Sequence, residues 1–123
     1  MAESRSKVLV VDDEPKVAQT LKKLLEFNGH QVTTCFESAK VTSLIKSEEF
    51  ELVLLDVRMP VLGETELLSL IKKLRPELLV IIVSAYYEHS QASILTALGA
   101  YEVVHKPFEV QVFLGAVARA IGK

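Results

Sequence analysis

The sequence predicts an α/β fold in which helices cover both faces of a parallel sheet. Short apolar runs alternate with amphipathic segments five times along the 123 residues, and such alternation of strands and helices produces a parallel sheet. Two of the runs contain no polar residue, as expected of strands that are buried on both faces. The length fits one domain, residues 1–123, which would bury roughly two-thirds of its unfolded surface.

The apolar runs are the predicted strands. The first is rich in β-branched residues, the third and fourth are continuous, and the last is short. The predicted strands are Lys7–Val11, Gln31–Cys35, Leu52–Leu55, Leu79–Val83 and Val103–His105.

The first two helices are predicted from apolar residues at helical spacing and from their end signals. The first begins at Asp13-Glu14-Pro15, with acids in its first turn and proline near its first position. Asn28-Gly29 is expected to end it with a left-handed cap. Ser38 is the expected N-cap of the second helix.

The remaining helices have similar signals. Arg75-Pro76 ends the third helix, because the residue before a proline disfavours the helical conformation. The fourth spans roughly residues 88–98 and ends at Gly99, and Pro107 opens a fifth that runs towards Ile121.

Five such units favour the flavodoxin-like (βα)5 three-layer sandwich, with strand order 2-1-3-4-5. Right-handed crossovers place helices on both faces of the sheet. Ligands of such folds bind at the carboxyl ends of the strands, beside the point where the strand order reverses. Here that point lies between the first and third strands.

Composition and charge exclude several classes of function. The net charge of −2, with Lys and Arg spread along the chain, gives neither a basic surface for nucleic acid nor a polybasic membrane anchor. No apolar run approaches the ~20 residues that span a bilayer, and the polar segment 1–7 is not a secretory signal. Cys35 is the single cysteine and is expected to be a buried structural thiol. We therefore expect a cytoplasmic protein that does not itself bind DNA.

Polar residues that could carry chemistry follow four of the predicted strands. Asp12 and Asp13 follow the first strand, Asp56 the third, Ser84 the fourth and Lys106 the fifth. The predicted strand order brings them to one edge, where two carboxylates ~4–5 Å apart repel by about 4 kcal/mol at an effective dielectric constant of ~20. Either one carboxylate is protonated or cations compensate the charge.

Lys106 supplies one cation, and the other must come from solution. An incomplete cage of oxygen ligands suits Mg²⁺ (or Mn²⁺), which keeps several waters and leaves positions open for phosphate oxygens. A carboxylate beside such a cation and a lysine has the composition of a phosphoryl acceptor. The glycine-rich loops of nucleotide sites are missing from the sequence.

Four motifs resemble those of CheY-like response-regulator receiver domains, and they occur in the order and spacing of that family. They are VLVVDDEP (8–15), LVLLDVRMP (52–60), VSAY (83–86) and GAYEVVHKPF (99–108). The last two are most similar to the receivers of NtrC-type regulators. The resemblance covers essentially the whole chain. It implies a phosphoacceptor domain of two-component signal transduction, which assists only its own phosphotransfer and autodephosphorylation and is not otherwise an enzyme.

The resemblance implies an acceptor and a metal site. Asp56 corresponds to the phosphorylation site, and Asp13 and Asp56 correspond to direct ligands of Mg²⁺. Asp12 corresponds to a residue that holds a metal-bound water. The backbone carbonyl of Arg58 corresponds to the remaining protein ligand.

The resemblance also implies switch residues and partners. Ser84 matches the switch Ser/Thr, and Lys106 matches the lysine that pairs with the phosphoryl group. The donor would be a phosphohistidine on a sensor histidine kinase or a phosphotransfer protein. Phosphorylation would shift the face formed by the fourth helix, the fifth strand and the fifth helix.

Two positions depart from the family pattern. Val103 stands where receivers usually have Tyr or Phe, so the usual coupled rotation of that ring with the Ser/Thr cannot operate as described. Tyr101 has the same strand parity and would replace the ring only after a register slip. In the loop after the third strand, the expected glycine is Glu64, and Gly63 lies one position earlier.

Arg58 and Tyr86 occupy the two variable positions that flank the acid pocket in this family. A large aromatic side chain at Tyr86 would cover the phosphoryl group and hinder attack by water. The hypothesis is slow self-dephosphorylation, and the alternative is that Tyr86 is an ordinary surface residue.

The last predicted helix carries more apolar side chains than one buried stripe needs. Arg119 is the only charged residue between Val110 and Ile121. We therefore expect part of this surface to contact a partner, either a second copy in a homodimer or an output domain.

Two other classes of function compete with the signalling switch. A metal-dependent phosphatase or phosphotransferase would place its nucleophile in a DxD pattern and add a cap domain, for which 123 residues leave no room. A receiver-fold binding module that is never phosphorylated is supported by Val103. The complete set of acids and Lys106 argues against it.

Overall fold

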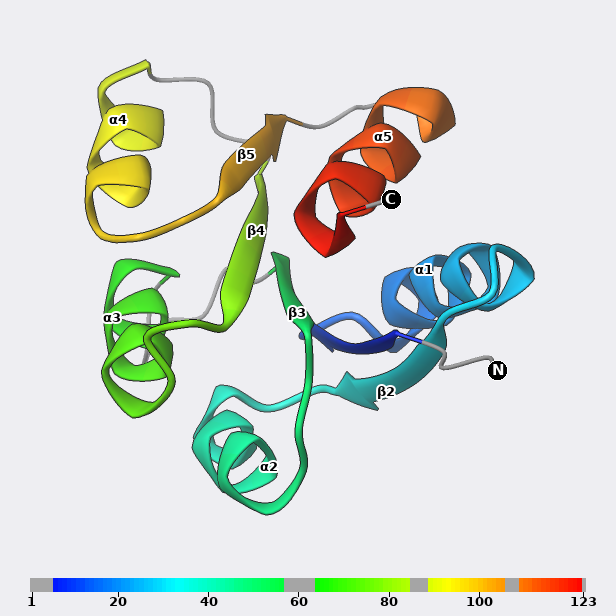
Figure 1. Cartoon of the computed structure of the whole chain (residues 1–123), viewed down its shortest axis with the longest axis horizontal. Helices are drawn as coiled ribbons and strands as arrows, with labels where there is room; N and C mark the ends of the chain where they lie inside the picture. Colours follow the sequence, from blue (N-terminus) through cyan, green and yellow to red (C-terminus); the bar gives the residue numbers. More distant parts are fainter. Residues whose placement is uncertain (1–5, 57–63, 85–88, 106–108, 123) are drawn as a thin grey trace.

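The strands form one parallel sheet in the predicted order, β2-β1-β3-β4-β5 (Figure 1). The computed structural model describes residues 6–56, 64–84, 89–105 and 109–122. Its strands are β1 Lys7–Asp12, β2 Gln31–Cys35, β3 Leu52–Asp56, β4 Leu79–Ser84 and β5 Glu102–His105. Three of them include the polar residue that was expected to follow the strand, because backbone pairing continues to the edge of the sheet.

Helices cover both faces of the sheet and produce the predicted three layers (Figure 1). The α-helices are α1 Pro15–Phe27, α2 Val41–Ser47, α3 Glu64–Leu74, α4 His89–Ala97 and α5 Val110–Ile121, and the 3₁₀ helix η1 Ser38–Lys40 precedes α2. α1 and α5 lie on one face, and α2, α3 and α4 lie on the other. Within the described ranges, no helix is long and apolar enough to cross a membrane.

The two sides of the sheet have separate apolar cores, and β1 contributes alternate residues to each. Val8 and Val10 pack with residues of α1 and α5. Leu9 and Val11 pack with residues of α2, α3 and α4. Because β1 lies inside the sheet and is buried on both faces, its sequence from Val8 to Val11 is continuously apolar.

The predicted start of α1 was right about its proline, because the helix begins at Pro15, but wrong about its acids, and two other predicted helix starts were wrong. The acids Asp13 and Glu14 precede the first turn of α1, which begins at Pro15, and Glu14 is the N-cap without a side-chain capping bond. Ser38 is not an N-cap, because the chain turns into η1 directly after β2 and Ser38 is buried as its first residue. α5 begins at Val110 after the extended N-cap Glu109, and Pro107 lies outside the described residues.

Gly29 ends α1 in the left-handed conformation that Asn28-Gly29 predicted, with φ at +91°. Its N–H donates to the Glu26 carbonyl, and the His30 N–H donates to the Leu25 carbonyl. This pair of bonds is a Schellman motif.

Gly29→Ala should lower the free energy of unfolding by about 1–2 kcal/mol, measured by urea denaturation, because a Cβ disfavours the left-handed conformation. No atom lies within 4 Å of the new Cβ, so the loss would report backbone strain alone. Gly115→Ala is the control. Gly115 lies inside α5 without a positive φ, and alanine there should raise stability by up to about 1 kcal/mol. Equal changes in the two variants would contradict the strain argument.

Candidate functional site

The carboxyl ends of four strands meet at one edge of the sheet. β1 ends at Asp12 and β3 at Asp56, and these two residues are direct Cα partners in the parallel ladder. β4 ends at Ser84 and β5 at His105, which are partners in the same way. The structure therefore brings together the backbones of the acids that the sequence singled out.

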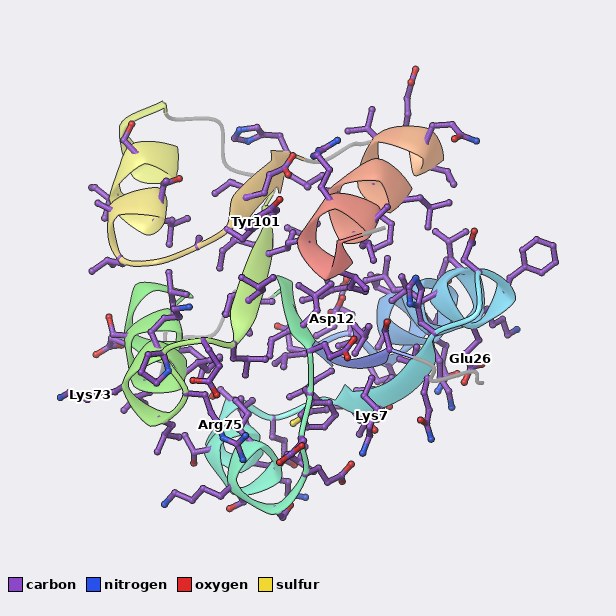
Figure 2. All side chains as sticks on the ribbon, in the orientation of Figure 1. Lys7, Asp12, Glu26, Lys73, Arg75 and Tyr101 are labelled. Carbon is purple, nitrogen blue, oxygen red and sulfur yellow. The ribbon has the colours of Figure 1, made fainter. Side chains whose placement is uncertain are left out.

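Asp12 is a buried carboxylate at this edge, with 1% of its surface exposed (Figure 2). Its Oδ1 accepts a hydrogen bond of 2.8 Å from the Glu14 N–H. Glu14 is the N-cap of α1, so the carboxylate lies at the positive end of that helix. This bond and the helix dipole stabilise a negative charge that burial alone would make costly.

The acids of the edge are aspartates, although glutamate is the common acid elsewhere in the chain. The sequence contains only three aspartates, Asp12, Asp13 and Asp56, and every other acid is a glutamate. Asp13 is exposed next to buried Asp12. The short aspartate side chain holds its oxygens close to the backbone, which suits a site whose geometry is set by strand ends.

The donors at this edge fit Mg²⁺ or Mn²⁺, because they are hard carboxylate oxygens without thiolate or imidazole clusters in the described part of the chain. Those residues contain no complete group of three metal-binding side chains. The Asp56 and Ser84 side chains and all of Arg58, Gly63, Tyr86 and Lys106 lie outside the described residues.

Val103 occupies the centre of β5 without any shift in register. It pairs with Ile82 of β4, and its half-buried side chain packs against the core under α2, α3 and α4. Tyr101 precedes β5 and is 42% exposed, and its N–H donates to the Val80 carbonyl at 2.7 Å. The described register therefore leaves valine at the position where an aromatic residue was expected.

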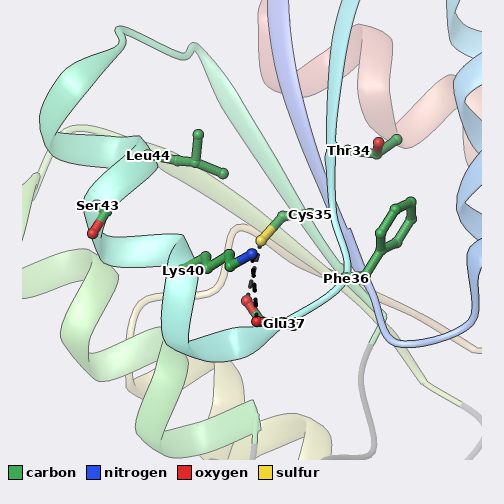
Figure 3. Close-up of a pocket in the computed structure, with 7 residues that line it drawn as sticks. All are labelled: Thr34, Cys35, Phe36, Glu37, Lys40, Ser43 and Leu44. Atoms are coloured by element: carbon green, nitrogen blue, oxygen red, sulfur yellow. Dashed lines mark hydrogen bonds and ion pairs between the residues drawn. The ribbon is translucent and has the colours of Figure 1, made fainter.

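A cavity of about 330 Å³ lies at the carboxyl end of β2 (Figure 3). Cys35 lies beside it and is buried, as predicted from the sequence. The Cys35 Sγ donates to the Glu37 carbonyl at 3.1 Å, and the Lys40 Nζ lies 3.7 Å from a Glu37 carboxylate oxygen. Sequence reasoning missed this cavity because the bend of the chain from β2 through η1 into α2 forms it. The lining residues, all within 34–44, are Thr34, Cys35, Phe36, Glu37, Lys40, Ser43 and Leu44.

Cys35 should react slowly with iodoacetamide in the folded protein. Burial raises the pKa of the Cys35 thiol, so less of it is thiolate at pH 8 than in an unfolded chain. Alkylation followed by intact mass should be roughly tenfold slower in buffer than in 8 M urea. The native rate should rise as the pH increases above 9. Equal rates in the two solvents would show that the thiol is accessible.

A family model described as "Response regulator receiver domain" matches residues 8–118. NtrC, a DNA-binding transcriptional regulator of Bradyrhizobium sp., is 34% identical over 116 residues, covering 94% of this chain and 24% of NtrC. The response regulator protein FleR of Pseudomonas aeruginosa is 33% identical over 119 residues, covering 96% of this chain and 25% of FleR. The chain thus spans about a quarter of the length of these relatives.

Solved receiver domains have the same fold. The receiver domain of NtrX from Brucella abortus is 30% identical with a TM-score of 0.87, covering 94% of this chain and 98% of that one. The beryllofluoride-activated NtrC4 receiver domain dimer is 32% identical with a TM-score of 0.88, covering 94% of this chain and 96% of that one. With the strand order, the paired acids and the family match in agreement, the chain belongs to the response-regulator receiver domain family of two-component systems.

Proposed function

We propose that this receiver accepts a phosphoryl group on Asp56 in a reaction that requires Mg²⁺ or Mn²⁺. The donor is a phosphohistidine of a sensor histidine kinase or a phosphotransfer protein. The observation that carries the proposal is the register that aligns Asp56 with buried Asp12, beside exposed Asp13. The family consists of signalling domains and is not a known family of catalytic enzymes.

The proposed roles follow the positions at the edge. Asp13, Asp56 and the Arg58 carbonyl would hold the cation directly, and Asp12 would hold it through a water. Such a cation neutralises charge on the transferring phosphoryl oxygens.

The remaining proposed roles concern the phosphoryl group itself. The Asp56 carboxylate attacks phosphorus while the bond to the donor nitrogen breaks, giving an aspartyl phosphate and a free histidine. Lys106 pairs with the phosphoryl oxygens, and Ser84 donates a hydrogen bond to one of them.

The partner face proposed for this domain consists of α4, β5 and α5. The described part of this face exposes several large apolar side chains, which would favour contact with another protein. They are Ile94, Leu98, Tyr101, Val110 and Val112. α5 itself is buried on one stripe only, so its other faces remain available. A second copy or an output domain fits, since NtrC4 forms a receiver dimer and the regulator relatives are about four times longer than this chain.

The domain boundaries proposed are residues 1–123 as one receiver, supported by the match over residues 8–118. Intact mass after incubation with acetyl phosphate tests the function. With Mg²⁺, the protein should gain one phosphoryl group, about 80 Da. With excess EDTA it should gain none. No gain under either condition would favour the receiver-fold binding module that is not phosphorylated.

Tyr86→Ala should shorten the lifetime of the phosphorylated protein by about tenfold. We propose that Tyr86 and Arg58 flank the phosphoryl group and that the tyrosine ring hinders attacking water. The phosphorylated fraction is followed by intact mass after removal of acetyl phosphate, with Tyr101→Ala as the control. An unchanged lifetime in Tyr86→Ala would show that the ring does not shield the site.

A further inference from the structure

The described half of α4 is held to the domain by few side chains. Leu95 is buried, but its neighbours Ile94 and Thr96 are exposed. By contrast, α3 buries Leu67, Leu68 and Ile71, all three without any exposed surface. Because burial of apolar side chains supplies most helix stability in proteins, the described half of α4 is weakly stabilised by its own packing.

Lys72 of α3 connects this helix to two other elements near the end of α4. Its Nζ donates to the Leu78 carbonyl, just before β4, at 2.7 Å. Its Cγ and Cε lie 3.1 Å from the place where a Cβ of residue 99 would be. The lysine stem therefore passes directly over Gly99, which follows α4, before its ammonium reaches Leu78.

The chain at the end of α4 is itself fixed by consecutive hydrogen bonds. Gly99 has φ at +116°, and its N–H donates to the Thr96 carbonyl. The Ala100 N–H donates to the Leu95 carbonyl, completing a Schellman motif. The Tyr101 N–H then joins the β4 ladder at the Val80 carbonyl. The positive φ favours glycine at this place, and a Cβ there would also press on the Lys72 stem, which would have to shift.

α3 is itself firmly packed in the domain, so a contact with it can hold another element in place. Besides its buried residues, the Arg75 guanidinium at its end donates to the Ile45 carbonyl of α2 at 3.0 Å. The Lys72 Cε, which carries the ammonium, also lies over Gly99 at the C-terminal end of α4, where the helix dipole favours positive charge. The contacts of Lys72 thus fix one end of a helix whose described half has little other anchorage.

We propose that Lys72 is a positioning residue that holds the C-terminal end of α4 to α3 and β4, so that α4 pivots about Gly99 when the domain changes conformation. This proposal rests on the proposed function for the signal, which is phosphorylation of Asp56. The joint itself is present in the unphosphorylated domain. It confines movement of α4 to its N-terminal side.

Hydrogen exchange of Lys72→Met tests the joint, because methionine keeps an apolar stem and removes the ammonium. Lys73→Met is the matched control, since Lys73 is the next residue of α3 and points into solvent (Figure 2). In unphosphorylated protein, the amides of Gly99 and Ala100 should exchange roughly fivefold to tenfold faster in Lys72→Met than in wild type. They should be unchanged in Lys73→Met. Circular dichroism confirms that both variants are folded.

Phosphorylation supplies the readout that a merely stabilising contact would not change. In wild type, acetyl phosphate and Mg²⁺ should alter exchange on the N-terminal side of α4 and leave Gly99 and Ala100 unaltered. In Lys72→Met, the alteration should extend through these two residues. Equal exchange of the Gly99 and Ala100 amides in wild type and Lys72→Met without phosphate would show that Lys72 does not hold the end of α4. A wild type that gains no phosphoryl mass would refute the proposed function instead, while the first comparison still decides on the joint.

Discussion

Asp56→Asn should abolish the gain of phosphoryl mass from acetyl phosphate and Mg²⁺. The amide is a very weak nucleophile and also a poorer ligand for a hard cation, so both the attack and the metal site are impaired. We expect at least a hundredfold loss of the initial rate, measured as the phosphorylated fraction by intact mass.

Glu51→Gln is the matched control for this variant. Glu51 is an exposed carboxylate that precedes β3, whereas Asp56 ends the same strand, so the two changes remove equal charge from opposite ends. Glu51→Gln should be phosphorylated at the wild-type rate. A mass gain that persists in Asp56→Asn would show that another side chain is the acceptor, and Asp13→Asn would then be the variant to examine.

The stability of Asp56→Asn separates loss of chemistry from loss of fold. Removing one negative charge beside Asp12 and Asp13 reduces repulsion at the edge, so the free energy of unfolding should stay equal or increase. A decrease would mean that Asp56 has a structural role that the proposal does not contain. Urea denaturation without added metal measures this free energy of unfolding.

Phe113→Ala should lower the free energy of unfolding by about 3–5 kcal/mol, a large fraction of the stability of a domain of this size. Phe113 has no exposed surface and lies in the core between α5 and the sheet, with Val104 and Val117. Its removal loses the transfer free energy of the ring and leaves a cavity that rigid strands cannot fill.

Phe27→Ala makes the same chemical change at the opposite extreme of burial. Phe27 is the last residue of α1, and 90% of its surface is exposed. Its loss should change stability by no more than about 0.5 kcal/mol. Urea denaturation of both variants, with the same slope against urea, checks the pair. A similar loss in the two variants would show that α5 is not packed as described.

Sequence patterns predicted the strands because each strand depends on local periodicity, and the alternation of five strands and helices favoured their order. The continuous run Leu52–Leu55 indicates a strand buried on both faces, and the structure shows it at the centre of the sheet. Asn28-Gly29 predicted the end of α1 because glycine adopts a positive φ without strain. The family motifs also lie in single short segments, so they were readable without a structure.

Helix starts were less predictable than helix ends. Ser38 has the residue type of an N-cap, but the chain turns there directly after β2 and buries it in η1. Pro107 suits the first turn of a helix, yet α5 begins at Val110, after the extended residue Glu109. The path of the chain after β2 decided the place of Ser38, and residue type alone does not contain that path.

The sequence by itself determined the fold class and the family and singled out the acids of the candidate site, because each of these depends on local patterns of burial and on short motifs. Only the tertiary structure decided that Asp12 is buried and bonded to the Glu14 N–H while Asp13 is exposed. Only the tertiary structure placed Lys72 over Gly99. This last contact joins residues that are far apart along the chain, so their distance in space cannot be read from the sequence. Strand register and helix packing bring them together, and both depend on the packing of the whole core.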